Sequence, residues 1–115
     1  MTNAIGSADD IDYALELVRG RWRLLIVREL LAGPQRPGSL ARALRTVAKN
    51  RLHQNLRDLE RMGLVRRTQF DGRVPKVEYS LTPLGTSLRS VIDTLTAWGA
   101  ENGRQLNGNG DGRRG

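Results

Sequence analysis

The spacing of the apolar residues changes along this chain in a way that admits few folds. Through residues 11–62 apolar side chains recur at helical intervals, whereas through residues 77–81 they alternate with polar ones, as in a strand with one apolar face. Residues 64–70 are a suitable partner strand, and the Asp71-Gly72 dipeptide between the two segments is a strong hairpin signal. The pattern therefore predicts a mainly helical protein with one small β-hairpin.

Helices are expected on both sides of this hairpin. The four that precede it are expected at about residues 9–19, 21–32, 39–45 and 49–62. Asp9 or Asp10 is the expected N-cap of the first helix, and Ser39 that of the third. After the hairpin, Thr82-Pro83 is expected to start one long helix, because threonine caps helices and proline fits their first position.

The length of 115 residues fits one domain. We expect a flexible polar segment at residues 1–8, a folded domain at residues 9–102, and a flexible glycine-rich tail at residues 103–115. No apolar run approaches the ~20 residues that span a bilayer. The polar, acidic N-terminus does not resemble a secretory signal, so we expect a cytoplasmic protein without membrane contact.

Composition excludes several kinds of chemistry. The chain has no cysteine, so disulfides, thiolate metal sites and cysteine nucleophiles are impossible. Its single histidine argues against a histidine-rich metal site. There is no cluster of acids, no pair of base and nucleophile, and no glycine loop that would hold phosphates. We therefore expect neither an enzyme nor a protein that uses a cofactor or a metal ion.

The positive charge is concentrated in the middle of the chain. Residues 1–18 hold four acids and no base, whereas residues 19–76 hold fifteen Lys and Arg against four acids. Residues 77–115 are neutral, so the central segment accounts for the net charge of +7. A surface that binds a polyanion explains this concentration, and a general abundance of arginine is the alternative.

A helix pair joined by a tight turn and followed directly by a hairpin is the plan of a winged helix-turn-helix, in which the second helix of the pair enters the major groove of DNA. That helix is expected at residues 49–62, with three leucines on one side and amides and cations on the other. Its candidate DNA-binding residues are Lys49, Asn50, Arg51, His53, Gln54, Arg57 and Arg61. The amides of Asn50 and Gln54 suit adenine, and Arg57 suits guanine. For His53 the alternative is a plain surface residue.

The neighbouring segments add further cations. In the hairpin the candidates are Arg67, Arg73 and Lys76. In the first helix of the pair and beside it they are Arg36, Arg42 and Arg45. We expect Arg73, near the hairpin tip, to reach an adjacent minor groove. We expect the cations of the first helix and its surroundings to bind phosphates, and such contacts set the register of the protein on DNA but carry little sequence information. The alternative for each cation is a solvated side chain of little effect.

The first and last helices are candidates for self-association. Their candidate interface residues are Ile11, Leu15, Trp22, Leu88, Ile92, Leu95 and Trp98. A long C-terminal apolar stripe is hard to bury within one protomer of this size, which favours a long dimerisation helix and a two-fold homodimer. Burial in the core is the alternative for the aromatic residues. A small-molecule effector near the dimer interface is a further expectation.

Four segments, ALELVRGRW, LLIVRELLAGPQR, LHQNLRDLERMGLVRR and VEYSLTPLG, resemble those of the HxlR-type winged helix-turn-helix transcriptional regulators. The resemblance runs from about residue 9 to about residue 102. It implies a cytoplasmic bacterial or archaeal regulator that forms dimers through its first and last helices and binds an inverted repeat. It also implies a recognition helix at residues 49–62 and a wing at residues 69–76.

The chain departs from the resembling family at two places. Many relatives carry a cysteine before the first helix, which some use to sense oxidants or electrophiles, but Asp9 stands there in this chain and thiol sensing is impossible. Relatives also commonly begin the recognition helix with a serine-like cap. Ala48 occupies that position here and cannot cap, so either Thr46 caps one turn earlier or the first turn frays until DNA binds.

These features together predict a sequence-specific DNA-binding transcriptional regulator that acts as a homodimer on an inverted-repeat operator, as a repressor rather than an activator. The main alternative is a winged-helix module that binds proteins and has lost specific DNA binding. That alternative predicts acids on the face of Asn50, Gln54 and Arg57, and Asp58 and Glu60 are expected to lie to its sides. An RNA-binding domain is a weaker alternative, because the hairpin lacks an aromatic stacking platform.

Overall fold

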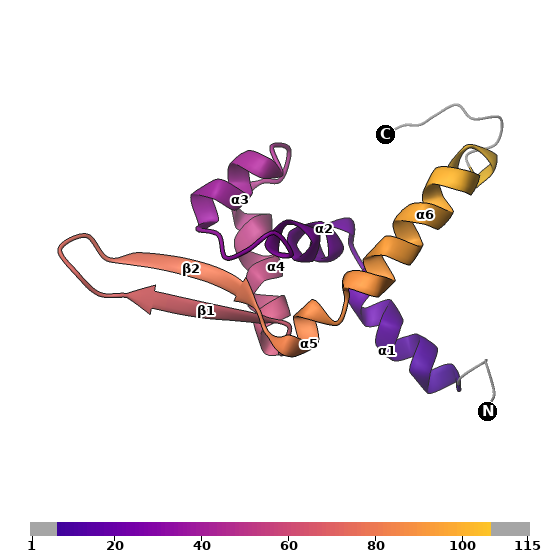
Figure 1. The fold of residues 1–115 in the computed structure, drawn as a ribbon, viewed down its shortest axis with the longest axis horizontal. Coiled ribbons are helices and arrows are strands. Elements are labelled where there is room, and N and C mark those ends of the chain that lie inside the picture. The colour runs from indigo at the N-terminus through magenta and orange to yellow at the C-terminus, as the bar shows by residue number, and fades with distance from the viewer. Residues whose placement is uncertain (1–6, 107–115) are drawn as a thin grey trace.

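The computed structural model describes residues 7–106 of the chain. Its elements are α1 (Ala8–Val18), α2 (Arg21–Leu30), α3 (Pro37–Ala43), α4 (Lys49–Arg61), β1 (Val65–Phe70), β2 (Lys76–Leu81), α5 (Pro83–Thr86) and α6 (Arg89–Leu106), as Figure 1 shows. The mainly helical fold with one antiparallel hairpin, predicted from the apolar spacing, is confirmed. In this winged helix-turn-helix, α3 and α4 form the helix pair and the hairpin forms the wing.

The core forms around α2. Ile26 and Val27 of α2 are fully buried, and three leucines of α4, at i, i+4 and i+7, are buried among them. The remaining buried side chains come from the end of α2, from the other long elements and from residues next to them. They are Leu17, Leu30, Leu40, Leu44, Leu64, Val65, Tyr79 and Ile92. One cluster therefore fixes the helix pair, the base of the wing and the two end helices to α2.

A backbone bridge attaches the wing to the segment before α3. The Gln35 N–H donates to the Tyr79 carbonyl at 2.9 Å, and the Tyr79 N–H donates to the Gln35 carbonyl at 2.8 Å. This single isolated bridge lies at the outer edge of β2 and places the start of α3 beside the wing.

The helix starts differ from the expected caps. Ser7, rather than Asp9 or Asp10, caps α1: its Oγ accepts the Asp10 N–H at 3.2 Å, and the Asp10 carboxylate accepts the Ser7 N–H at 3.0 Å. The α3 helix begins at Pro37, so Ser39 lies inside it. Proline at the first helical position explains this earlier start, because its fixed φ already suits a helix.

The start of α4 lacks a side-chain cap. Ala48 is the N-cap residue and makes no side-chain hydrogen bond there, and Thr46 does not take its place one turn earlier. The helix nevertheless forms from Lys49 onward, because burial of its leucine stripe stabilises it through tertiary contacts.

The segment after the wing is two helices rather than the single long one expected. The Thr82 Oγ accepts the Gly85 N–H at 3.0 Å and donates to the Gly63 carbonyl at 2.7 Å. A Cβ on Gly85 would lie 2.1 Å from the Leu64 carbonyl oxygen. The Thr82 hydrogen bonds and the close approach of Gly85 to Leu64 hold α5 against the start of the wing. The chain then turns at residues 87–88 before α6 begins.

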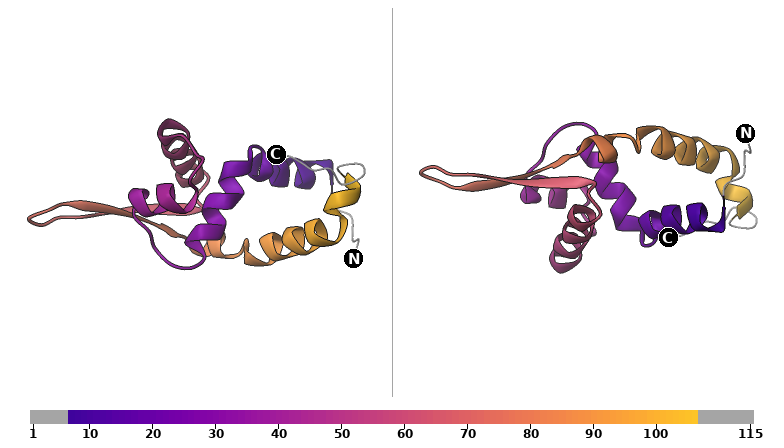
Figure 2. Two further views of the ribbon diagram at one scale, coloured as in Figure 1. Left: turned by 90° about the horizontal axis from the view of Figure 1, so that it is seen from above. Right: turned by 90° about the horizontal axis from the view of Figure 1, so that it is seen from below.

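The two end helices extend away from the wing. Both α1 and α6 contact α2, and they project from the end of the molecule opposite the hairpin (Figures 1 and 2).

The helical region is longer than the expected 9–102, since it begins at Ala8 and runs to Leu106. The expected flexibility of residues 1–6 and 107–115 lies outside the described residues. Within residues 7–106, no helix combines the length and apolar character needed to cross a membrane.

The contact at Gly85 leads to a prediction about stability. Gly85→Ala should lower the free energy of unfolding by about 3 kcal/mol, the upper end of the usual cost of overpacking, because the new methyl group meets backbone rather than a movable side chain. Urea unfolding at a fixed protein concentration measures this change.

Gly103→Ala is the matched control for this substitution. Gly103 lies in α6 and a Cβ there would meet nothing within 4 Å, so stability should stay the same or rise by up to about 1 kcal/mol. Equal behaviour of the two variants would show that the contact between Gly85 and Leu64 carries no constraint.

Candidate nucleic-acid interface

The leucine stripe of α4 leaves the opposite side of the helix exposed. Leu52, Leu56 and Leu59 are at most 1% exposed. The exposed side chains on the opposite face are Asn50, Gln54, Arg57 and Arg61, and we call these four the reading face. Its residues lie where the helical spacing predicted them, on an outward surface of amides and cations.

An acid is bonded to this face. The Gln54 Nε2 donates to the Asp58 carboxylate at 3.0 Å, and Arg61 forms an ion pair with the same carboxylate. The Arg57 guanidinium donates to the Gln54 Oε1 at 3.0 Å. Asp58 does not lie on the exposed face itself, since its side chain is only 17% exposed, but its i+4 position brings it one turn from Gln54, within reach of a side-chain hydrogen bond.

Asp58 is also tied to α2 and, through it, to α1. The Arg23 guanidinium donates to the Asp58 carboxylate at 3.3 Å, and the side chains are only 14% and 17% exposed. Arg23 also bonds the Glu16 backbone carbonyl and lies 3.7 Å from the Glu16 carboxylate. Neither Arg23 nor Asp58 was among the candidates. The i, i+4 spacing of Gln54 and Asp58 was a usable signal for Asp58. No local pattern indicates that Arg23 pairs with Asp58, because the two residues are far apart in the sequence.

The surroundings of Asp58 keep its carboxyl group ionised. Burial alone raises the pKa of Asp58, but the hydrogen bonds from Gln54 and Arg23 and the charges of Arg61 and Arg23 outweigh burial and lower the pKa below its ordinary value. A carboxylate that is ionised at neutral pH acts only as a hydrogen-bond acceptor.

The other candidates of α4 lie around the start of the helix and along one side. Lys49 and Arg51 are exposed, and Arg51 lines, together with Asn50 of the reading face, a hollow of about 570 Å³ that reaches Arg19 and Arg23. His53 is half-buried, between the reading face and the core side of the helix.

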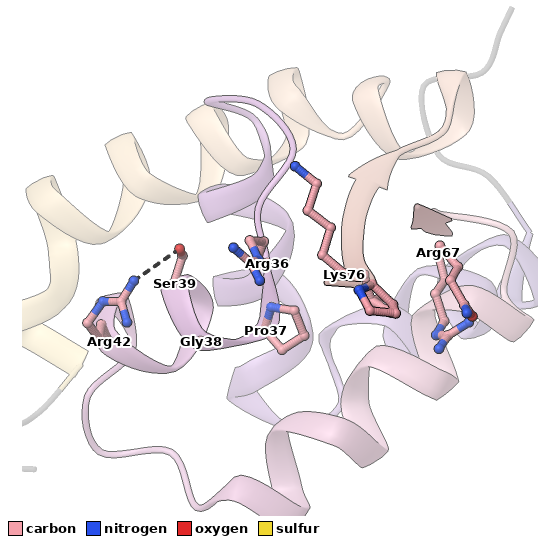
Figure 3. Close-up of a pocket in the computed structure, with 10 residues that line it drawn as sticks. Arg36, Pro37, Gly38, Ser39, Arg42, Arg67 and Lys76 are labelled. Carbon is pink, nitrogen blue, oxygen red and sulfur yellow. Dashed lines mark hydrogen bonds between the residues drawn. The ribbon is translucent and has the colours of Figure 1, made fainter. Parts of the chain in front are cut away.

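A basic hollow lies between α3 and the wing (Figure 3). Its volume is about 630 Å³, and four of the predicted cations line it with no acid among the lining residues. These four, which define the basic hollow, are Arg36, Arg42, Arg67 and Lys76. Lys76 also lies 4.0 Å from the Glu78 carboxylate. Arg73 is exposed in the loop at the wing tip, apart from this group.

Two of the predicted residues lie together elsewhere. Arg45, in the turn between α3 and α4, has a φ of +28°, and it lines a separate hollow of about 370 Å³ with Trp22. Trp22 is half-buried, with the Arg21 guanidinium 4.8 Å from its ring centroid. Trp22 therefore lies against the helix pair rather than where the end helices project, because its position on α2 directs it toward α3.

The remaining interface candidates divide into exposed and covered residues. Ile11, Leu15, Leu95 and Trp98 are 46–55% exposed on α1 and α6. Ile92 is 7% exposed and packs in the core of its own protomer, and Leu88 is half-buried against that core.

Among residues 7–106, no three His, Cys, Asp or Glu side chains gather where they could hold a metal ion.

Comparison with known proteins agrees with this architecture. The HxlR-like helix-turn-helix family model matches residues 17–107. The uncharacterised HTH-type transcriptional regulator YtcD of Bacillus subtilis is 37% identical over 90 residues, which cover 78% of this chain and 71% of YtcD.

Solved structures of similar proteins show the same fold. A transcriptional regulator of the MarR family from Enterococcus faecalis V583 is 34% identical with a TM-score of 0.77, and the match covers 92% of this chain and 96% of the regulator. The reduced form of the redox regulator HypR is 28% identical with a TM-score of 0.79, covering 85% and 97%. The chain belongs to the HxlR-like helix-turn-helix family and is a DNA-binding transcriptional regulator, not an enzyme.

Proposed function

We propose that this regulator is a sequence-specific repressor that acts as a homodimer on an inverted-repeat operator. The observation that carries the proposal is the exposed reading face of α4, with the wing and its basic hollow on the same DNA-binding unit. A regulator bound to DNA works where the chromosome is, so we place the protein in the cytoplasm.

The chemistry of the reading face suits base edges in the major groove. The groove of B-DNA is about 12 Å wide and admits one α-helix. Side-chain amides such as those of Asn50 and Gln54 bond adenine N6 and N7 together, and a guanidinium such as that of Arg57 bonds guanine O6 and N7. His53 lies beside this face and is a further proposed contact.

The basic hollow suits the sugar–phosphate backbone beside that groove. Its four cations come from α3, from the residue before it and from both strands of the wing, so a DNA strand that passes between them would be held from two sides. Lys49, Arg51 and Arg61 are proposed to add phosphate contacts, and Arg73 at the wing tip is proposed to reach the adjacent minor groove. Arg45 lies on the separate hollow and is proposed as an outer backbone contact.

The end helices are the proposed dimer interface. Six large apolar side chains on them are 37–55% exposed, which leaves unburied surface of the kind that homodimers cover. They are Ile11, Leu15, Val18, Val91, Leu95 and Trp98. Since α1 and α6 project away from the wing, a two-fold dimer joined through them leaves both reading faces free to lie about 34–36 Å apart, one turn of duplex.

Repression requires less of the protein than activation does. A dimer that occupies an operator overlapping a promoter blocks transcription through DNA binding alone, whereas an activator also needs a surface that contacts polymerase. An effector that binds near the dimer interface remains a prediction, and it would act by changing the separation of the two reading faces.

Removal of two reading-face side chains should reduce base discrimination. Each bidentate contact contributes about 1–3 kcal/mol of discrimination, so the double variant Gln54→Ala/Arg57→Ala should bind a selected duplex far more weakly while binding a scrambled duplex nearly as before. Competition binding at one salt concentration measures both affinities. Arg104→Ala/Gln105→Ala removes the same residue types from α6 and should change neither affinity. Equal losses on both duplexes would contradict base reading.

Removal of basic-hollow side chains should act on all sequences alike. Each released phosphate contact contributes about 0.9 to the log–log slope of affinity against salt, so Arg36→Ala/Arg67→Ala should reduce the magnitude of that slope by about 2. Titrations at several salt concentrations, with selected and scrambled duplexes, measure the slopes. An unchanged slope would show that these two arginines stay solvated in the complex.

Truncation of the exposed apolar stripe on α6 should separate the protomers. Leu95→Ala/Trp98→Ala removes two large apolar side chains from each protomer, and burial of such a side chain is worth about 1.5–3 kcal/mol. The dimer dissociation constant should therefore rise by on the order of 10³-fold or more, as measured by sedimentation equilibrium. Val74→Ala, at an exposed apolar position on the wing, should leave the constant unchanged. A wild-type protein that stays monomeric at micromolar concentration would refute the proposed assembly.

A further inference from the structure

A chain of side-chain hydrogen bonds runs from inside the protein to the reading face. Arg23 of α2 donates to Asp58, Gln54 donates to the other oxygen of that carboxylate, and Arg57 donates to Gln54. The outer end of this chain is exposed, whereas Arg23 and Asp58 are mostly covered. The orientation of the exposed Gln54 amide is thus linked to two side chains that are mostly covered.

The partners of Gln54 decide which way its amide points. An ionised carboxylate only accepts hydrogen bonds, and a guanidinium only donates them. The Gln54 Nε2 must therefore face Asp58, and its Oε1 must face Arg57. The flipped amide would set two donors together at Arg57 and two acceptors together at Asp58, so both hydrogen bonds would be lost.

The amide held in this way keeps one donor and one acceptor for DNA. Its NH₂ group has two N–H donors and uses one on Asp58, while its oxygen has two acceptor sites and uses one on Arg57. A donor next to an acceptor matches the adenine N7 and N6 groups. Guanine presents two acceptors, N7 and O6, so one of them would face the Gln54 oxygen.

We propose that Asp58, held by Arg23, is a positioning residue for base reading: it fixes the Gln54 amide in the orientation that prefers adenine over guanine. This inference rests on the proposed function, in which α4 reads bases. It extends that function by assigning specificity at one base pair to a residue that does not itself touch DNA.

Two features favour positioning over a purely structural ion pair. Arg23 is itself held by the Glu16 backbone carbonyl and carboxylate, so Asp58 has a fixed partner and cannot swing with Gln54. A carboxylate this near DNA also weakens binding, because it repels the phosphates. An apolar contact between α2 and α4 would link the two helices equally well without this repulsion. Asp58 also pairs with Arg61, a proposed phosphate contact, but its bond to Gln54 is the one that bears on a proposed base contact.

The test begins with a duplex selected from a random pool by the wild-type protein. Asp58→Asn keeps the shape of the side chain but presents an amide, which can either donate to or accept from Gln54. Its preference for adenine over guanine at one base pair should fall about tenfold, within the ~1–3 kcal/mol carried by one bidentate contact. Preferences at the other base pairs should not change. Competition with single-base variants of the duplex gives each preference.

Two controls separate orientation from charge and from folding. Glu60→Gln removes one negative charge from the exposed surface of the same helix, and it should raise affinity for every duplex without changing any preference. In the background of Gln54→Ala, Asp58→Asn should cause no further loss at the chosen base pair, because the amide it orients is gone. Arg23→Ala leaves Asp58 in place but unsupported, and should weaken the same single preference if Asp58→Asn fails to fold.

The outcomes are distinguishable. Loss confined to the base pair that Gln54→Ala also affects supports the inference. Unchanged preferences in folded Asp58→Asn, or losses that persist in the Gln54→Ala background, overturn it and leave the proposed function standing. A wild-type protein that enriches no sequence from the pool overturns the proposed function, and this inference with it.

Discussion

Three leucines of α4, Leu52, Leu56 and Leu59, lie almost wholly buried among side chains of the core, and their burial decides which side of the helix faces outward. Each contributes about 1.5–3 kcal/mol relative to an exposed position, so rotation of α4 by a quarter turn would cost several kcal/mol. The helix has no side-chain cap at its start, and this burial is what holds it in place. The reading face is therefore a consequence of packing behind it.

Local patterns were sufficient for much of the fold. The apolar period located the long helices and the hairpin, and the leucine spacing identified the outward residues Asn50, Gln54 and Arg57, because burial at helical intervals involves neighbours in the chain. The same spacing failed after Thr82, where one long helix was expected. The break falls between α5 and Arg89, and α5 is held by the close approach of Gly85 to Leu64, a residue from a different part of the sequence.

Apart from the local bond between Gln54 and Asp58, the parts of the site that escaped prediction depend on contacts between distant segments. Arg23 and Asp58 are separated by 35 positions, and neither residue type nor charge indicates that they pair. The location of Trp22 beside the helix-pair turn depends on how α2 is rotated within the core, which periodicity leaves open when apolar residues surround most of a helix. The gathering of four cations around one hollow likewise requires knowing that the wing folds back beside α3.

The bridge between Gln35 and Tyr79 determines how that hollow can vary. Both of its hydrogen bonds join backbone atoms, so they do not depend on which side chains occupy the two positions. Substitutions on the walls can thus change the hollow's charge while the separation of α3 and the wing stays the same. The width of the hollow is thus set by the backbone, whereas its charge is set by side chains that can be replaced independently.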